Sequence, residues 1–336
     1  MVKGKRELVA RASAAAGFTS LLQAIPKRNL LLVLNYHRIG NVCENPYDPG
    51  LISATAAEFD DQIGYLKRHF HMVTAEETVA MANGETPLRA GALVTFDDGY
   101  LDNYTLAFPV LRSHGVQGVF FLPTSFIGTA RLPFWDVIAY VVRQSKKKVI
   151  RMEYPEAAVF DLERNGFESE LMKILGVSKT IGDRDGFIGA LAQACDTSIP
   201  PEPETRRFLN WQEAREMHRA GMAIGSHTHN HEILSRLSPE QQCYELRQSR
   251  QILEEQLATR IDILSYPDGG PSTFSAATMD ALRKTGYRAA FSYYGGINRP
   301  GKLQPFDILR CSIERPSPPR FRLQTTLTAV TGGPWF

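Results

Sequence analysis

The sequence predicts an α/β fold built around a parallel sheet. Seven short apolar runs have the composition of strands that are buried on both faces, which is typical of parallel sheets. These runs are residues 30–36, 92–96, 118–122, 222–225, 261–266, 287–291 and 308–313. Helical patterns separate them, and a chain that alternates strand with helix favours parallel pairing. The alternation by itself fits either a doubly wound sheet or a barrel.

Two of the intervening helices have starts that can be recognised in the sequence. Thr74 is followed three residues later by Glu77, the pattern of a capping box in which each side chain binds a backbone N–H group of the other residue. Ser238 and Pro239 open a second helix, with proline at the first helical position, and we expect it to continue to about Ala258. These defined ends support the alternation of strands and helices.

Residues 1–28 are expected to form a basic amphipathic helix that ends near Pro26. The segment has a single acid, Glu7, and six basic residues, which are Lys3, Lys5, Arg6, Arg11, Lys27 and Arg28. Such a helix can pack on the domain as an ordinary solvated helix, or it can make peripheral contact with a membrane surface. Both interpretations stay open at this point.

The chain shows no sign of export or of membrane insertion. No continuous apolar segment with a cleavage site follows the first basic residues, so a secretory signal is not expected. The longest apolar runs, such as residues 30–34, are much shorter than the roughly 20 residues that span a bilayer. We therefore expect a cytoplasmic protein, peripheral at the cytoplasmic face of the membrane if residues 1–28 bind lipid.

The composition of the 336-residue chain is that of an ordinary globular protein, with 43% hydrophobic and 22% charged residues. The formal net charge of +2 gives no reason to expect a nucleic-acid partner. The cysteines are scattered without a C-x-x-C pair, which argues against a zinc ribbon or a disulfide framework and favours a reducing compartment. They are Cys43, Cys195, Cys243 and Cys311.

The alternation is interrupted between about residues 128 and 207. This stretch holds Trp135, the basic run 146–148 and a proline-rich segment at 199–203. A connection of this length in a compact fold usually has a structure or function of its own, so we expect a helical insertion. The main domain is then residues 29–320 with this insertion, and residues 321–336 are expected to be a C-terminal tail.

The first motif with chemical potential is V-T-F-D-D-G-Y at residues 94–100, where an apolar strand ends in two carboxylates and a glycine. At a strand end that enters a glycine turn, adjacent side chains can reach one cavity. One acid, Asp97 or Asp98, can then bind a cation while the other removes a proton from a nearby water. The alternative interpretation is a solvated turn in which Asp98 and Gly99 have no chemical role.

The second motif is a group of three histidines, His227, His229 and His231, just after another apolar strand. His227 and His231 are four residues apart, so a helical turn after the strand would place both rings on one face, where they could bind one metal ion. His229 would then point elsewhere. Histidines that serve only packing are the alternative, but three within five positions favour a metal site.

Together these two motifs resemble the polysaccharide deacetylases of carbohydrate esterase family 4, the NodB-homology fold. That family combines T-F-D-D-G-Y with a downstream H-T-x-x-H, which here is residues 227–231. Residues 34–39, L-N-Y-H-R-I, resemble the first strand of its biofilm and exopolysaccharide branch. Residues 211–217 and the loop 265–269, S-Y-P-D-G, are also similar to family segments, so the resemblance covers about residues 30–315.

The resemblance implies a distorted parallel (β/α) barrel of about seven strands. It also implies that Asp98, His227 and His231 bind a divalent metal, with Zn²⁺ expected first and Co²⁺ or Ni²⁺ as alternatives. Asp97 would be the general base that deprotonates the attacking water. These residues follow the carboxyl ends of predicted strands, where barrel enzymes place their active sites.

The sequence departs from the family pattern in the loop 265–269 and in the last strand. The loop lacks the arginine of the family and has Asp268 where an aromatic residue is common, although the backbone N–H of Asp268 could still bind an oxyanion. The last strand, 310–313, has no histidine to act as general acid.

Two residues can compensate for these departures. His37 matches a first-strand histidine that acts as general acid in the biofilm branch, and its alternative role is a hydrogen bond to an aspartate. Arg310 is expected to orient Asp97 or to replace the missing arginine, and a surface salt bridge is the alternative.

The resemblance thus implies an enzyme that hydrolyses an acetamide to acetate and a free amine. Its substrate would be an N-acetylated polysaccharide or a lipid-linked oligosaccharide. Two other functions are compatible with the same barrel: a catalytically silent glycan-binding protein, or a metal-dependent hydrolase of another acyl ester or amide. Retention of both aspartates and of the two histidines of the motif argues against the silent protein.

Overall fold

The computed structural model describes residues 2–335 and is built on a parallel sheet. Seven strands lie in the order β10-β9-β8-β5-β4-β1-β11, and each neighbouring pair is parallel. They are β1 (Leu31–Tyr36), β4 (Gly91–Phe96), β5 (Gly118–Leu122), β8 (Ala223–Ser226), β9 (Ile263–Ser265), β10 (Ala289–Phe291) and β11 (Cys311–Ser312). Each strand corresponds to one of the seven apolar runs, so the strand prediction is confirmed.

The two edges of the sheet are joined by the chain segment that leads into β11. Ile308 forms a parallel bridge with Phe291 of β10, and three residues later Cys311 pairs with Leu34 of β1. This segment therefore pairs with β10 at one point and with β1 at the next, and it closes the sheet. The closure confirms the distorted barrel and excludes a doubly wound sheet.

The inward face of the barrel changes from apolar to polar toward the carboxyl ends of the strands. Side chains alternate along a strand, so Leu31, Val33 and Asn35 of β1 share one face. Leu31 and Val33 belong to a buried apolar cluster with Leu93 of β4. Asn35 continues this inward row as a polar residue that lacks any exposed surface. Polar chemistry is therefore concentrated at one end of the barrel.

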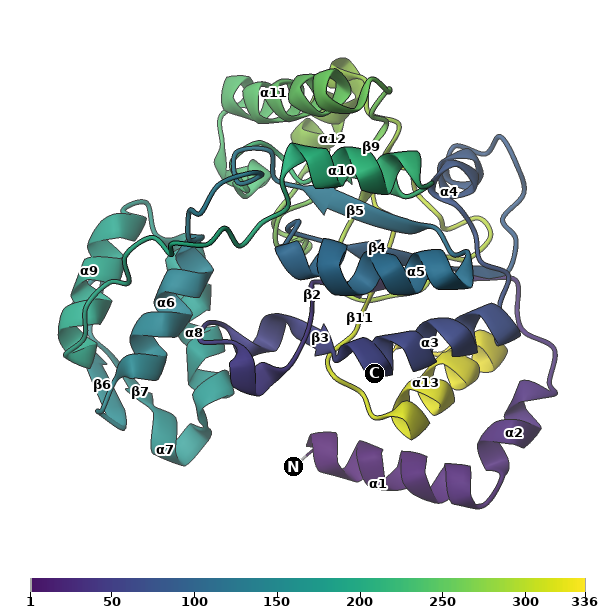
Figure 1. The fold of residues 1–336 in the computed structure, drawn as a ribbon, viewed down its shortest axis with the longest axis horizontal. Helices are drawn as coiled ribbons and strands as arrows, with labels where there is room; N and C mark the ends of the chain where they lie inside the picture. Colours follow the sequence, from purple (N-terminus) through teal and green to yellow (C-terminus); the bar gives the residue numbers. More distant parts are fainter. Residues whose placement is uncertain (1, 336) are drawn as a thin grey trace. The chain divides into compact units, whose positions relative to one another are not determined.

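Helices cover the outside of the strands, as α5 does over β4 and β5 in Figure 1. They are α3 (Ala56–His69), α5 (Phe108–His114), α10 (Trp211–Arg219), α11 (Pro239–Leu257) and α12 (Ala276–Thr285). The helix α4 (Ala75–Ala82) instead packs against the inward apolar cluster that contains Leu31 and Val33. The capping box expected at Thr74 is present, and Ser238 and Pro239 begin α11 as expected, where Ser238 also forms a capping box. Among the described residues, no helix has the length and apolar character needed to cross a bilayer.

The single N-terminal helix expected over residues 1–28 is instead a pair, α1 (Val2–Ala15) and α2 (Phe18–Gln23). Gly17 separates them with a φ of 70°, a left-handed conformation that stops a right-handed helix. Ala10 and Leu22 pack against Leu323 near the C-terminus. Met1 and the side chain of Lys3 lie outside the described residues.

Residues 321–336, expected to be a tail, lie largely in the helix α13 (Pro318–Thr331). Ser317 caps its N-terminus by accepting a hydrogen bond from the backbone N–H of Arg320, and prolines occupy the first helical positions. Phe321 is fully buried, and Tyr65 of α3 contacts the Oγ1 of Thr326 at 2.5 Å. The main domain therefore continues past residue 320, because α13 packs beside α3 (Figure 1).

The chain divides into two compact units. Unit 1 consists of residues 1–40, 53–129 and 208–336, and it contains the barrel. Unit 2 consists of residues 41–52 and 130–207, so it takes in a short segment outside the expected insertion at 128–207. Its elements are α6 (Phe134–Gln144), β6 (Val149–Met152), β7 (Ala158–Asp161), α7 (Leu162–Asn165), α8 (Phe167–Thr180) and α9 (Arg184–Cys195). The helices of unit 2 enclose an apolar core of their own.

The remaining elements are short. They are β2 (Arg38–Ile39), β3 (Ile52–Ala54), the 3-10 turns Val42–Glu44, Pro49–Leu51 and Leu234–Arg236, and the π-helical turn Asn103–Ala107 that leads into α5.

Candidate active site

The residues predicted to do chemistry lie at the carboxyl end of the barrel. His37 directly follows β1, Asp97 and Asp98 follow β4, and His227 follows β8. The structure brings Asp98 into contact with His227 and His231, and it brings the adjacent Asp97 into contact with Arg310. Polar side chains of separate strands therefore meet where barrel enzymes hold their active sites.

Asp98, His227 and His231 form a compact cluster of metal-ligating atoms. The Oδ1 of Asp98 lies 3.4 Å from the Nε2 of His227 and 3.3 Å from the Nε2 of His231, and all ligand atoms lie within 4.8 Å of one another. Two atoms bound at about 2.05 Å to a tetrahedral ion are roughly 3.3 Å apart. The spacing and the donor set of these residues therefore fit a divalent metal ion such as zinc.

A tight turn after β4 positions both aspartates at this end of the barrel. Asp98 has a φ of 73° and Gly99 one of 67°, so two successive residues adopt the left-handed conformation. A Cβ on Gly99 would lie 2.8 Å from the Leu122 side chain, so only glycine fits without a shift. Backbone strain of about 1–3 kcal/mol at a non-glycine residue such as Asp98 is typical of functional sites.

The two ligand histidines converge through an irregular loop, and the expected helical turn after β8 is absent from the described structure. Thr228 and His231 have φ values of 63° and 59°, which interrupt any helix. The N–H groups of His229 and Asn230 donate to the Oε2 of Glu245, at 2.9 and 2.8 Å, rather than to carbonyls one helical turn earlier. His227 and His231 therefore approach the same point because the Glu245 carboxylate holds the loop between them in an irregular conformation.

Hydrogen bonds fix the orientation of each histidine ring in this loop. The Nδ1 of His227 lies 2.8 Å from the carbonyl oxygen of Ser265, so it donates there and leaves Nε2 for a metal ion. The Nδ1 of His229 lies 2.8 Å from the Oγ1 of Thr124. His229 therefore points away from the cluster, as expected.

Arg310 is fully buried and uses all five of its N–H groups, which excludes the surface salt bridge considered from the sequence. Two of them bind both carboxylate oxygens of Asp97 at 2.8 Å. The other three donate to the Oδ1 of Asn35, the Oγ of Ser265 and the carbonyl oxygen of Ser292. A bidentate pair of this kind holds the carboxylate plane of Asp97 in one orientation.

The electrostatics of the site keep both carboxyl groups ionised. Burial raises the pKa of Asp97, but the Arg310 guanidinium and, less strongly, His227 bring it below its ordinary value. Burial likewise opposes the ionisation of Asp98, yet hydrogen bonds from His227 and His231 hold its pKa well below the ordinary value. Asp97 can therefore accept a proton at neutral pH.

The two ligand histidines respond differently to these charges. Burial lowers the pKa of His227, but Asp97 and Asp98 outweigh it, so the pKa is raised. Burial dominates at His231 and lowers its pKa. The negative field that raises the pKa of His227 also favours a bound cation.

His37 and Asp268 lie at the rim of the same end and are linked through Tyr293. The rings of His37 and Tyr293 meet edge to face with centroids 5.3 Å apart, and the Arg310 guanidinium lies 5.4 Å from the Tyr293 ring centre. The N–H of Tyr293 donates at 2.7 Å to the carbonyl of Gly269, which follows Asp268. Asp268 itself is exposed and has a φ of 62°.

The residues that position the catalytic candidates were not predicted from the sequence. Asn35 donates from Nδ2 to Asp97 at 3.1 Å, Ser265 contacts both Arg310 and His227, and Tyr293 packs against His37. Asn35 and Ser265 interrupt apolar strand runs, and this interruption was a usable signal. Nothing in the sequence near Tyr293 or Glu245 indicated their contacts.

Substitution of Arg310 by methionine should destabilise the fold, because it leaves the Asp97 carboxylate buried without its cation. Removing one partner of a buried ion pair costs about 3–5 kcal/mol. Urea unfolding would measure this loss of free energy. Arg283→Met is the matched control: Arg283 pairs with Asp280 on an exposed helix surface, where such a pair contributes at most about 1 kcal/mol. Equal losses in the two variants would contradict this account.

Glu245→Gln should weaken metal binding by about 10–100-fold, the usual effect of altering a group that orients metal ligands. The Glu245 carboxylate also accepts from the Nδ2 of Asn230 at 2.7 Å, and an amide cannot accept from every one of these donors. Titration calorimetry with Zn²⁺ on metal-free protein would measure the change. Glu255→Gln on the exposed face of the same helix is the control and should bind zinc like the parent protein. Unchanged affinity in Glu245→Gln would refute the loop-holding role.

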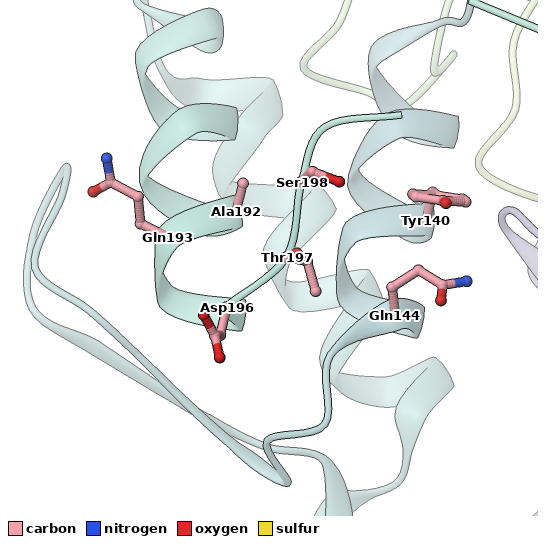
Figure 2. Close-up of a pocket in the computed structure, with 7 residues that line it drawn as sticks. All are labelled: Tyr140, Gln144, Ala192, Gln193, Asp196, Thr197 and Ser198. Carbon is pink, nitrogen blue, oxygen red and sulfur yellow. The ribbon is translucent and has the colours of Figure 1, made fainter. Parts of the chain in front are cut away.

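A cavity of about 590 Å³ on unit 2 is a separate feature of the molecule (Figure 2). Its lining comes from α6, from α9 and from the segment that follows α9. The lining residues are Tyr140, Gln144, Ala192, Gln193, Asp196, Thr197 and Ser198. It includes none of the residues predicted to do chemistry, so the candidate active site remains the end of the barrel.

Comparison with known proteins finds a relative in sequence. A Bacillus subtilis (strain 168) protein, YxkH, whose name describes a polysaccharide deacetylase, is 22% identical over 262 residues. The match covers 77% of this chain and 62% of YxkH, so the chain spans less than two thirds of that relative.

Two solved structures have a similar fold. Streptococcus pyogenes deacetylase PplD in complex with acetate is 18% identical, with a TM-score of 0.57 over 90% of this chain and 99% of PplD. IcaB from Ammonifex degensii is 20% identical, with a TM-score of 0.56 over 88% of this chain and 97% of IcaB. At these identities the similarity shows the barrel fold.

The family itself is identified from the sequence. The family model described as polysaccharide deacetylase matches residues 86–290, which is more than half of the chain. The matched range includes Asp97, Asp98, His227, His231 and Asp268, whereas His37 and Arg310 lie outside it. The chain belongs to the polysaccharide deacetylase family.

Proposed function

We propose that this protein is a metal-dependent hydrolase that removes N-acetyl groups from the amino sugars of a polysaccharide. The observation that carries the proposal is the position of Asp97. Its carboxylate is buried, ionised and held by Arg310, while the adjacent Asp98 belongs to a cluster of metal-ligating side chains. A fixed base beside a cation site is the arrangement that activates water for attack on an amide.

The ligands in this proposal are Asp98, His227 and His231. A divalent ion bound there supplies Lewis-acid activation of water and of the acetamide carbonyl. Asp97 takes the proton from the attacking water, and Arg310 keeps its carboxylate oriented during that transfer. Zn²⁺ suits the mixed nitrogen and oxygen donor set, with Co²⁺ or Ni²⁺ as substitutes.

Two further groups complete the proposed reaction. His37 protonates the amine as it leaves, and the edge contact with Tyr293 restricts the orientation of its ring. The backbone N–H of Asp268 stabilises the developing oxyanion, for which the identity of the side chain is unimportant. Cleavage of the C–N bond then gives acetate and a free amino sugar.

The buried site argues against a catalytically silent glycan-binding protein. A protein that only binds sugars does not require the buried bidentate pair of Arg310 and Asp97. Burial of these two charges carries a large desolvation cost, which catalysis by Asp97 would explain. A metal-dependent hydrolase of another acyl ester or amide would use the same groups. Such a hydrolase remains the second candidate function, and it differs from the proposed deacetylase only in the acyl group or bond that it recognises.

We further propose that the enzyme acts in the cytoplasm on a polymer that is lipid-linked. The basic residues of segment 1–28 support this proposal. If this segment binds anionic lipid, the enzyme lies at the same membrane surface as a lipid-linked saccharide.

The test is acetate release from a panel of soluble oligosaccharides with the acetyl group on nitrogen or on oxygen, together with N-butyryl analogues. The proposal predicts release of acetate from the N-acetylated sugars by the parent protein. Asp97→Asn should be inactive on the same panel. Hydrolysis of only the O-acyl or butyryl compounds would identify the second candidate, and no hydrolysis in the presence of Zn²⁺ would indicate the silent protein.

A further inference from the structure

The outward faces of α1 and α2 carry an unusual concentration of exposed apolar side chains. Among the described residues, eleven large hydrophobic side chains are exposed, and five of them lie between residues 8 and 25. Leu8 and Leu21 are the most exposed, at 70% and 69%. The five are Leu8, Val9, Phe18, Leu21 and Ile25, and we call them the N-terminal apolar patch. We propose that this patch docks on the surface of an anionic lipid bilayer.

The patch belongs to helices that are already held on the barrel unit by their opposite faces. Ala10 and Leu22 pack on Leu323 of α13. Arg28 donates from Nε to the carbonyl of Val330 at 3.2 Å, and Lys27 lies over the Phe70 ring. The apolar patch is therefore not the surface by which the two helices attach to their own unit.

Helical spacing places the exposed Leu8 on the side of α1 opposite the buried Ala10. Lys5, Leu8, Ala12 and Ala15 follow one another at intervals of three and four residues and are all exposed, whereas Ala10 is buried. In α2 and the turn after it, Phe18, Leu21 and Ile25 repeat the same spacing on the exposed side. Both helices thus expose apolar side chains on the side that faces away from Leu323.

The charges around the patch favour an anionic partner. Glu7, the one acid among residues 1–28, is turned toward α13, where it accepts from Ser317 Oγ and lies 3.6 Å from Arg320. Its charge is therefore compensated within the unit. Lys5 and Arg11, by contrast, are exposed beside the apolar side chains of α1. Long basic side chains can bury their stems at a bilayer boundary while their charges contact anionic lipid headgroups.

A second copy of the chain is a poorer occupant of this face. Pairing two patches would bring the exposed basic residues Lys5 and Arg11 of both copies together, and the one acid in the segment 4–28, Glu7, is turned toward α13. Interface cores are also depleted in lysine. Charge complementarity therefore selects an anionic lipid surface.

Vesicle flotation with the full-length protein tests the proposal. We expect the protein to float with vesicles of phosphatidylcholine and phosphatidylserine and to remain at the bottom with phosphatidylcholine alone. Binding should weaken as added salt shortens the Debye length from about 10 Å to about 3 Å. The double variant Leu8→Asp, Leu21→Asp should lose at least tenfold in vesicle affinity.

The matched control is Val159→Asp, Met172→Asp, which places the same charges at exposed apolar positions of unit 2 and should float like the parent protein. Circular dichroism and activity on a soluble acetylated sugar should be unchanged in both double variants, because neither touches the active site. Equal flotation of the patch variant and the parent protein would overturn the proposal. Dimerisation that depends on Leu8 and Leu21, without flotation, would also overturn it in favour of a second copy.

Discussion

Replacement of Asp97 by asparagine should lower turnover by about 10²–10⁴-fold, the usual contribution of a general base. The amide has nearly the same shape as the carboxylate but cannot take a proton from water. The metal-ligating atoms belong to Asp98, His227 and His231, so metal content should remain close to that of the parent protein. Turnover and bound metal, measured on the same preparation, provide the comparison.

Two other substitutions serve as comparisons for Asp97→Asn. Asp98→Asn should lose metal as well as activity, because its Oδ1 faces both ligand histidines. Asp61→Asn removes a carboxylate that pairs with Arg322 on the surface of α3 and should leave both properties unchanged. If Asp97→Asn also lost its metal ion, or if it retained full turnover, the division of labour between the two aspartates would be wrong.

The strands were predictable because their signal is local. Each strand lies in a mostly apolar run of residues because both of its faces are buried. The capping box at Thr74 likewise lies within four consecutive residues. The motifs that end β4 and β8 were predictable for the same reason. By contrast, the packing of α13 depends on contacts between the two ends of the chain, such as those of Leu323 with Ala10 and Leu22, which no local pattern contains.

The site was predictable in its residue types more than in its geometry. The two ligand histidines meet, but through a loop held by Glu245 rather than through the helical turn that their spacing suggested. Arg310 was expected to orient Asp97 or to replace the missing arginine, with a surface salt bridge as the alternative. Closure of the barrel between β10 and β1 is what places its guanidinium against Asp97, and closure depends on long-range pairing.

The contacts of Arg310 also bear on the arginine missing from the loop 265–269. Its Nη2 donates to the Oγ of Ser265, the first residue of that loop, while both Nη atoms bind Asp97. A guanidinium from the last strand thus provides a cation for Asp97 from a position distant in sequence. Lysine at position 310 could not reproduce the contact, because its single ammonium group cannot form the planar bidentate pair.

Removal of the divalent ion should abolish activity, and Zn²⁺, Co²⁺ or Ni²⁺ should restore it. Free water, with a pKa near 15.7, is not ionised at neutral pH, whereas zinc can lower that pKa to about 7. His227→Ala should therefore bind no stoichiometric zinc and be inactive, as metal analysis and acetate release would measure. His229→Ala is the matched control in the same loop, since its ring contacts Thr124, and it should keep both metal and activity. Full activity in protein shown to be free of metal would contradict the proposed mechanism, because Asp97 alone cannot activate water sufficiently to attack an amide.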